Sequence, residues 1–158
     1  KKEETLADGA ATVAALSAAV TAMDDEEVTA TGRYLFITPT LLQGINDMDT
    51  TKSKKVLEGF EQVIKVPQRR FYTAIKQLSG KTGEEAGGYT KAAGAANINF
   101  AIVQKDALIQ YTKHAAPKII APENNPDADA YVFGYRMVGI AKAYKNMLSG
   151  MYFSHDKA

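Results

Sequence analysis

Few side chains in this sequence are of the types that carry out chemistry. The chain has 158 residues, with two histidines, His114 and His155, and no cysteine. Without cysteine there are no disulfides, thiolate metal sites or cysteine nucleophiles, and two histidines alone do not indicate a structural zinc site. A hydrolytic or metal-dependent enzyme would have to rely on these histidines, and we expect His114 at the end of a helix instead. Neither a Gly-x-Ser-x-Gly nor a His-Glu-x-x-His motif occurs, so the sequence predicts no enzyme and no cofactor.

Two oxygen-rich stretches resemble cation ligands. Residues 24–27 are four consecutive acids, and side-chain oxygens recur at positions 124, 125, 127 and 129. Consecutive acids at a helix end point in different directions, and the second stretch lacks the glycine and the closing glutamate of an EF-hand loop. We interpret the first stretch as the solvated end of a helix and the second as a turn, with calcium binding as the alternative.

Gly80-Lys81-Thr82 resembles the end of a phosphate-binding P-loop. The first glycine of that motif is absent, and no strand immediately precedes the triplet. Five glycines lie between residues 79 and 97, with almost no large apolar residue. The composition therefore predicts a mobile surface loop rather than a nucleotide site.

One basic stretch, residues 68–72, combines two arginines with two aromatic rings, Phe71 and Tyr72. Such pairs can contact phosphates and stack on bases, so the alternative hypothesis is a nucleic-acid-binding module. It would use Arg69, Arg70, Tyr72, Lys52, Lys54 and Lys55, and its affinity would fall with salt. The whole chain has 19 basic and 18 acidic residues, a net charge of +1, so no overall field attracts a polyanion. We favour solvated or ion-paired arginines, with Phe71 and Ile75 in the core.

The elements that position these residues begin with a helix and a central strand. Apolar residues recur at helical spacing among many alanines, so residues 5–28 are predicted to form a helix. Residues 34–37, Tyr-Leu-Phe-Ile, are apolar on both faces, which predicts a strand in the middle of a sheet and covered on both sides. A short helix capped by Thr38 is predicted at 39–45, because proline suits a first helical position.

The rest of the chain is predicted to alternate between strands, loops and one short helix. We expect strands at 60–66, 98–103 and 117–121, a helix at 107–114, loops at 46–53 and 79–97, and a connector at 122–129. Residues 130–144 and 151–155 are predicted to pair as a long C-terminal β-hairpin. The fold class is α+β: a single domain, 1–158, in which flanking helices cover a mixed central β-sheet. No apolar run approaches the ~18 residues that a membrane span needs.

In this order, these segments resemble the C-terminal half or more of the major capsid (coat) protein of tailed bacteriophages. That family has the Hong Kong-phage-type capsid fold, which bacterial encapsulins share. Each segment alone looks like many buried strands, but the ordered set covers nearly all of the chain, and the first and last segments are the most specific. The segments that carry the resemblance are Gly32-Arg33-Tyr34-Leu35-Phe36-Ile37-Thr38-Pro39, Val63-Ile64-Lys65-Val66-Pro67 with Arg70-Phe71, Asn99-Phe100-Ala101-Ile102-Val103, Asp106-Ala107-Leu108-Ile109-Gln110, Asp129-Ala130-Tyr131-Val132-Phe133-Gly134-Tyr135-Arg136 and Gly150-Met151-Tyr152-Phe153-Ser154-His155.

The resemblance implies a structural protein. Most of this chain would be the axial domain of a capsid subunit, and the final strands would be part of its peripheral domain. The family also has an N-terminal arm, an extended β-loop and a long spine helix. None is recognisable here, so we expect a fragment of a longer chain. Copies would assemble through hexamers and pentamers into an icosahedral virion shell around DNA, produced in the bacterial host cytoplasm. Scaffold, portal or packaged DNA would be further partners, without a membrane or a small-molecule substrate.

Surface loops, rather than core residues, are expected to carry the contacts between subunits. We expect these contacts at the acidic turn 24–27 and at Arg69, Arg70, Lys81, Glu84, Glu85 and Tyr89. The sequence leaves open whether the shell is that of a phage, a prophage or an encapsulin-type compartment.

Overall fold

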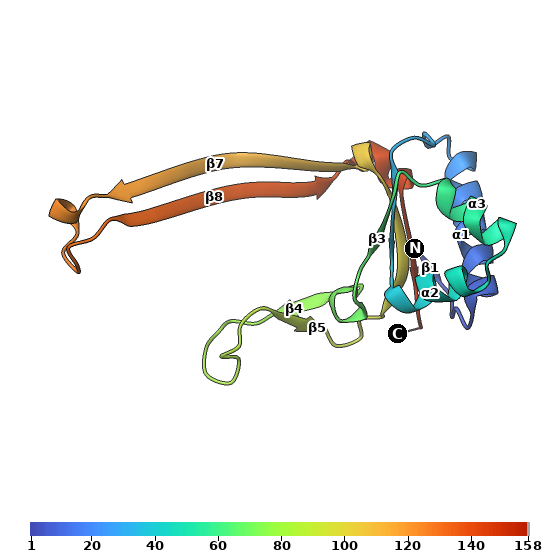
Figure 1. Ribbon diagram of the computed structural model, residues 1–158, viewed down its shortest axis with the longest axis horizontal. Helices are drawn as coiled ribbons and strands as arrows, with labels where there is room; N and C mark the ends of the chain where they lie inside the picture. Colours follow the sequence, from blue (N-terminus) through green and yellow to red (C-terminus); the bar gives the residue numbers. More distant parts are fainter. Residues whose placement is uncertain (158) are drawn as a thin grey trace.

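Five strands form a mixed sheet at the centre of the computed structural model, which describes residues 1–157. The strand order is β1-β9-β6-β2-β3, with three helices on one side of the sheet and two hairpins extending from the other side (Figure 1). The predicted α+β class is confirmed. The helices are α1 (Gly9–Asp25), α2 (Pro39–Asp47) and α3 (Thr51–Glu58), with short 3₁₀ turns η1 (Gln68–Arg70), η2 (Lys105–Ala107), η3 (Pro122–Asn124) and η4 (Lys145–Gly150). The strands are β1 (Lys2–Glu3), β2 (Arg33–Ile37), β3 (Gln62–Lys65), β4 (Ile75–Gln77), β5 (Tyr89–Lys91), β6 (Ile98–Gln104), β7 (Leu108–Ile120), β8 (Val132–Ala143) and β9 (Met151–His155).

β2 is an interior strand of the sheet, as predicted. It pairs in parallel with β3 and antiparallel with β6. Leu35 and Ile37 are fully buried, in the core that the helices cover. Tyr34 and Phe36, on the other face, are only half-buried. The prediction that both faces are covered is therefore wrong for the second face, because the helices pack against one side of the sheet.

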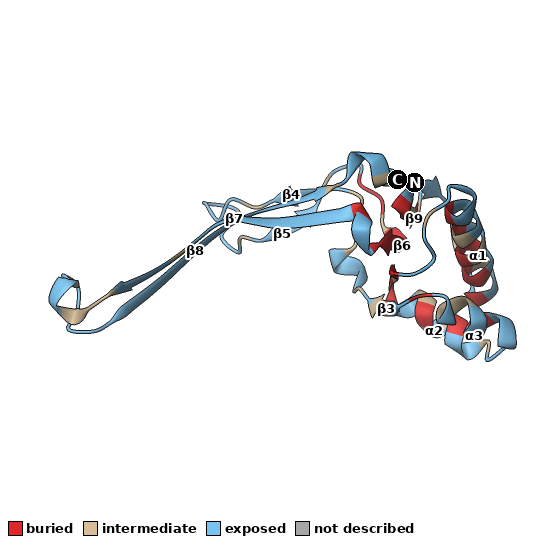
Figure 2. Ribbon diagram, turned by 90° about the horizontal axis from the view of Figure 1, so that it is seen from above, coloured by how far each residue is buried: buried red, intermediate tan, exposed pale blue. Residues whose placement is uncertain are grey.

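The hydrophobic core lies between the sheet and the helices. Phe100 of β6 is fully buried and stacks on Tyr152 of β9, with ring centroids 6.2 Å apart. One face of α1 supplies much of the rest, as its apolar stripe predicted, and Figure 2 shows this buried face in red. The buried members of the core are Val13, Ala15, Leu16, Ala19, Met23, Leu35, Ile37, Leu42, Ile45, Phe60, Phe100 and Ile102.

The N-terminal end of α1 is fixed by a cap and by a close contact with α2. The Asp8 carboxylate accepts a 2.7 Å hydrogen bond from the backbone N–H of Ala11, so the helix begins at Gly9 and not at the predicted residue 5. Gly9 lies directly against Gly44 of α2: a Cβ at Gly9 would stand 2.7 Å from the carbonyl carbon of Gly44. Glycine is thus required at the first helical position by packing.

The segment after the C-terminal end of α1 is held by the buried side chain of Arg33. Its guanidinium group donates hydrogen bonds to the carbonyl oxygens of Thr29, at 3.1 Å, and of Val28. It also forms an ion pair with Asp24 at 2.7 Å, although the arginine side chain is only 2% exposed. These bonds satisfy a buried cation, which would otherwise carry a large desolvation cost. One acid of the 24–27 run therefore has a structural role within this chain.

A third helix, α3, replaces the end of the predicted loop at 46–53. It begins with a capping box in which Thr50 and Ser53 each accept a 3.2 Å hydrogen bond from the other's backbone N–H. The Thr-x-x-Ser spacing was readable in the sequence. The usual capping-box motif has glutamate or glutamine at the fourth position, and here serine stands there, so the sequence indicates the helix start only weakly.

The second half of the chain differs most from the sequence prediction. Residues 108–120 are one strand, β7, so the predicted helix at 107–114 is wrong. The strand predicted at 117–121 is confirmed for residues 117–120, as the second part of that longer strand. β7 pairs antiparallel with β8 through twelve residue pairs. The C-terminal long hairpin exists, but its predicted partner segment was wrong, because residues 151–155 return as β9 to the central sheet.

Candidate functional site: the projecting hairpins

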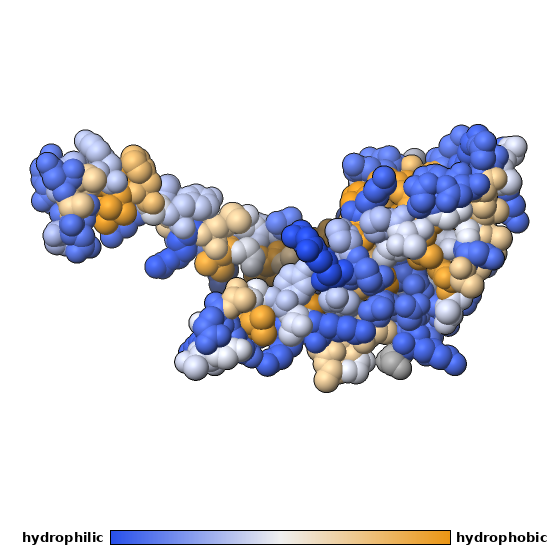
Figure 3. All heavy atoms as spheres, turned by 60° about the horizontal axis from the view of Figure 1, so that its bottom comes forward, coloured by the Kyte–Doolittle hydropathy of each residue, from blue (hydrophilic) through white to orange (hydrophobic). Residues whose placement is uncertain are grey.

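The β7–β8 hairpin, which we call the arm (residues 108–143), is the largest exposed apolar feature of the molecule. It stands away from the sheet, and its two strands pair only with each other (Figures 1 and 2). Figure 3 shows apolar side chains along it, in orange and tan, between polar ones. In residues 1–157, twelve of the fifteen exposed large hydrophobic side chains lie between positions 108 and 144. They are Leu108, Ile109, Tyr111, Ile119, Tyr131, Val132, Phe133, Tyr135, Met137, Val138, Ile140 and Tyr144.

One face of the arm carries no charged residue at any of its paired positions. Directly opposed residues of an antiparallel pair share a face, and successive residues alternate between faces. The cross-strand register therefore puts Phe133, Tyr135 and Met137 of β8 on one face, where Phe133 is 75% exposed and Met137 57% exposed. We call this the uncharged face. Its members are Leu108, Gln110, Thr112, Ala115, Pro117, Ile119, Phe133, Tyr135, Met137, Gly139, Ala141 and Ala143.

The opposite face of the arm is basic. A β-bulge between Thr112 and His114 shifts the register of β7 by one residue, so even-numbered residues before the bulge share a face with odd-numbered residues after it. Lys118, Arg136 and Lys142 lie on this basic face, and none of them forms an ion pair with another residue of the described chain. The members of the basic face are Ile109, Tyr111, His114, Ala116, Lys118, Ile120, Val132, Gly134, Arg136, Val138, Ile140 and Lys142.

The second, shorter hairpin, β4–β5, holds four of the predicted contact residues. Lys81, Glu84 and Glu85 lie in the loop between the strands, and Tyr89, 42% exposed, begins β5. The carboxylate of Glu84 accepts hydrogen bonds from Lys76 Nζ at 2.6 Å and from the backbone N–H and hydroxyl of Ser79, both at 2.8 Å. The predicted loop 79–97 is thus partly a hairpin. The Glu84 carboxylate links the end of the loop next to β4 through its hydrogen bonds with Lys76 and Ser79.

Acid is expected to loosen this loop. The bond from Lys76, followed by those from Ser79, lowers the pKa of Glu84 from 4.5 to about 2. A pKa lowered in the ordered state means that ionised Glu84 favours the ordered loop above pH 4.5, and this contribution is lost as the pH falls through about 2. NMR titration should show the Glu84 carboxyl resonance moving with a midpoint near 2.

The matched control for this titration is Glu84→Gln. That variant keeps the size of the side chain and removes its titration, so its loop should show weaker order that no longer changes with the ionisation of residue 84. A Glu84 midpoint at the ordinary value of 4.5 would contradict the described hydrogen bonds.

The basic–aromatic cluster predicted around Arg69 and Arg70 is spread out in the structure. Both arginines are exposed in η1, where the chain leaves β3. Phe71 is half-buried, but Ile75, predicted in the core, is 56% exposed in β4, so that prediction is wrong. Lys91 of β5, rather than either arginine, lies over the ring of Tyr72, at 5.7 Å from its centroid. Lys52, Lys54 and Lys55 lie on α3, on the helical side of the sheet, and Lys54 pairs with Asp49. The nucleic-acid hypothesis and the role of the two arginines in subunit contacts stay predictions.

The candidate catalytic and ligand-binding groups lie apart from one another. His114 is exposed in β7 and His155 lies in β9, so the helix-end position expected for His114 is wrong. Gly80-Lys81-Thr82 lies in a hairpin loop, not before a helix. Within residues 1–157, no cluster of three or more histidine or acidic side chains could hold a metal ion. None of the helices over that range is long and apolar enough to span a bilayer.

The oxygen-rich stretch at the tip of the arm is built as turn structure. The side-chain amide of Asn125 donates to the carbonyl oxygen of Ala130 at 2.9 Å, and the backbone N–H of Asp127 donates to the Asn125 side-chain oxygen at 3.3 Å. These are the local bonds with which asparagine stabilises turns. The turn interpretation of residues 124–129 is thus the one that matches the hydrogen bonding.

Comparison with known proteins provides no identification. No protein-family model matches the chain, and no curated protein sequence is significantly similar to it. The family resemblance therefore remains an expectation based on the ordered segments, and the site that requires a functional explanation is the exposed arm.

Proposed function

We propose that this chain is a structural subunit that self-assembles into a closed protein shell, of the type formed by the major capsid proteins of tailed phages and prophages. The observation that carries the proposal is the arm. Its twelve-residue uncharged face, which holds Phe133, Tyr135 and Met137, is exposed in the isolated subunit.

An apolar arm of this length is difficult to explain in a protein that works alone. A two-stranded hairpin without a packed face is marginally stable in water. At a rise of ~3.4 Å per residue, the arm is ~40 Å long, and at ~10 Å width each face offers roughly 400 Å². A face of this area is comparable to the largest apolar patch on a typical soluble monomer, and such patches are often functional. Its unpaired strand edges would also invite uncontrolled pairing unless they were covered.

Assembly offers a partner for these surfaces. In the proposed subunit, the sheet and its helices correspond to the axial domain, and the arm belongs to the peripheral domain. The uncharged face would pack against the rest of that peripheral domain, including the long spine helix that the resemblance implies. The strand edges and loops would then meet neighbouring copies in hexamers and pentamers, since identical subunits close a shell by symmetric repetition. The shell would enclose DNA in a virion assembled in the bacterial cytoplasm, or cargo in an encapsulin-type compartment.

The test is expression of the full reading frame that encodes this chain, followed by electron microscopy and size-exclusion chromatography with light scattering. We expect closed particles of uniform size. Met137→Lys, on the uncharged face, should reduce the particle yield at least about tenfold, because it places a cation in an apolar contact. The matched control is Ala18→Lys, which adds the same charge on the exposed face of α1.

Two results would contradict the proposal. One is a monodisperse monomer of the full reading frame under every condition of salt, pH and concentration. The other is a Met137→Lys variant that forms particles as efficiently as the Ala18→Lys control.

A further inference from the structure

Positive charge is concentrated on the two strands of the arm. β7 and β8 contain four of the 19 basic residues of the chain, Lys113, Lys118, Arg136 and Lys142, and none of its 18 acidic ones. The three acids of the arm, Glu123, Asp127 and Asp129, lie in the connector at its tip. On the paired strands, Lys118, Arg136 and Lys142 share one face.

The most concentrated negative charge on the body is the run Asp24 to Glu27 at the C-terminal end of α1, which we call the acidic corner. Acids are unfavourable there, because the helix dipole already makes that end negative. Asp24 is paired with Arg33, but Asp25, Glu26 and Glu27 are exposed and form no ion pair within residues 1–157. The acidic corner thus lowers the stability of its own chain, and a cation supplied from outside the chain would stabilise it.

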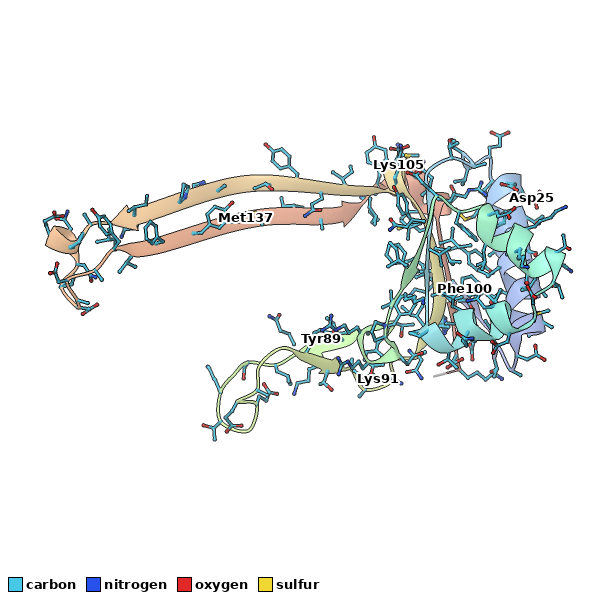
Figure 4. The ribbon with its side chains drawn as sticks, viewed as in Figure 1. Asp25, Tyr89, Lys91, Phe100, Lys105 and Met137 are labelled. Carbon is cyan, nitrogen blue, oxygen red and sulfur yellow. The ribbon has the colours of Figure 1, made fainter. Side chains whose placement is uncertain are left out.

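The arm and the acidic corner lie at opposite ends of the molecule. Figure 4 shows Asp25 at the outer end of the helical layer and Met137 on the arm, with the sheet between them. An arm therefore does not meet the acidic corner of its own chain. It can meet the corner of a second copy, and that copy's arm then remains free for a third.

We propose that the basic face of the arm docks on the acidic corner of a second copy of this chain. The contact joins different surfaces of the two copies, so it repeats head to tail and closes into a ring if the rotation between copies allows it. Opposed charges of this kind speed association and fix its register. The inference rests on the proposed self-assembly and names the surfaces that would carry one of its contacts.

The composition of the basic face favours a protein partner over a nucleic acid. Its cations are interleaved with exposed apolar side chains, Tyr111, Val138 and Ile140, which a phosphate backbone would leave in water. A hollow at the base of the arm also combines apolar and basic side chains. Its lining includes Ile109, Tyr111 and Ile140 together with Lys142 and Lys145.

The experiment reverses charge on each surface separately. The arm variant is Lys118→Glu with Arg136→Glu, and the corner variant is Asp25→Lys with Glu26→Lys, which leaves the Asp24–Arg33 pair intact. All four side chains are exposed, so folding should be unaffected. The control, Lys52→Glu with Lys55→Glu on α3, makes the same change of net charge as the arm variant. Self-association of the chain and of its full reading frame is measured by sedimentation velocity at low and high salt.

We expect each reversed variant alone to associate at least about tenfold more weakly than the unmodified chain at low salt, while the control does not. Combining both reversals in one chain should restore association. An equimolar mixture of the arm variant and the corner variant should also associate, because each then presents charges that match the other. High salt should weaken the association of the unmodified chain.

Several outcomes would overturn the inference, and they are distinct from failure of the proposed function. Particles that form equally well from both reversed variants would refute the arm-to-corner contact and leave shell formation standing. The arm-to-corner contact would also be refuted if the arm variant lost association and neither the combined variant nor the mixture restored it. If the arm variant also loses a salt-dependent mobility shift of duplex DNA, the partner is a nucleic acid. A full reading frame that never associates would refute the shell itself.

Discussion

Phe100→Ala is expected to destabilise the chain by about 3–5 kcal/mol, which is the usual cost of removing a fully buried phenylalanine side chain. Phe100 is completely buried at the centre of β6, between the helices and the stacked ring of Tyr152. Because a domain of this kind is stable by only about 5–15 kcal/mol, the variant should unfold at much lower urea concentration. Urea titration followed by circular dichroism measures the shift in midpoint.

Phe36→Ala is the matched control for that experiment. Its position in the central strand predicts full burial, in which case it would also cost about 3–5 kcal/mol. The side chain is half-buried instead, on the sheet face that the helices leave open. The expected cost is therefore about half, roughly 1.5–2.5 kcal/mol. Equal costs for the two variants would contradict the one-sided placement of the helices, and a loss under about 1 kcal/mol for Phe100→Ala would contradict the central core itself.

Gly9→Ala is expected to destabilise the chain by about 3 kcal/mol or more, at the upper end of overpacking costs. The added Cβ would lie 2.7 Å from the carbonyl carbon of Gly44 and closer still to its oxygen, so backbone must move. Either α1 shifts away from α2 or its first turn unwinds, and both changes reduce contact with the core. Thermal unfolding followed by circular dichroism should show a lowered midpoint.

Gly44→Ala tests the same contact from the other side. A Cβ at Gly44 would lie 3.5 Å from the backbone nitrogen of Gly9, which is ordinary van der Waals contact. Alanine is a better helix former than glycine by roughly 0.5–1 kcal/mol. Gly44→Ala should therefore be neutral or slightly stabilising. The decisive result is that Gly9→Ala lowers the stability of the chain and Gly44→Ala does not. Similar losses of stability in both variants would contradict this helix packing.

Elements that are specified by their own residues were predictable from the sequence. The stripe of apolar residues in α1, the apolar run of β2 with Pro39 directly after it, and the run of β6 correspond to observed elements. In each case the hydrophobic period and the adjacent breaker residues suffice to select one conformation. The α+β class follows from these elements, and so does the interior place of β2 in the sheet.

Residues whose local pattern fits two conformations were not predictable. Leu108, Ile109 and Tyr111 suit a helix face as well as a strand, and the long-range pairing of β7 with β8 selects the strand. The role of Arg33 depends on carbonyl groups of residues that precede it by four and five positions in a turn, which no spacing rule indicates. Gly9 is a weak helix former in the sequence and becomes necessary only through its contact with Gly44.

The candidate site divides in the same way. The sequence by itself determined which residue types were available: no cysteine, two separate histidines, an acidic run at 24–27 and a C-terminal region rich in aromatic and basic residues. Only the tertiary structure decided that this region pairs as an arm with one uncharged and one basic face. The reason is physical: a face of a hairpin is defined by the register between two strands and by the bulge at Thr112–His114, and both are set by contacts between residues far apart in the chain.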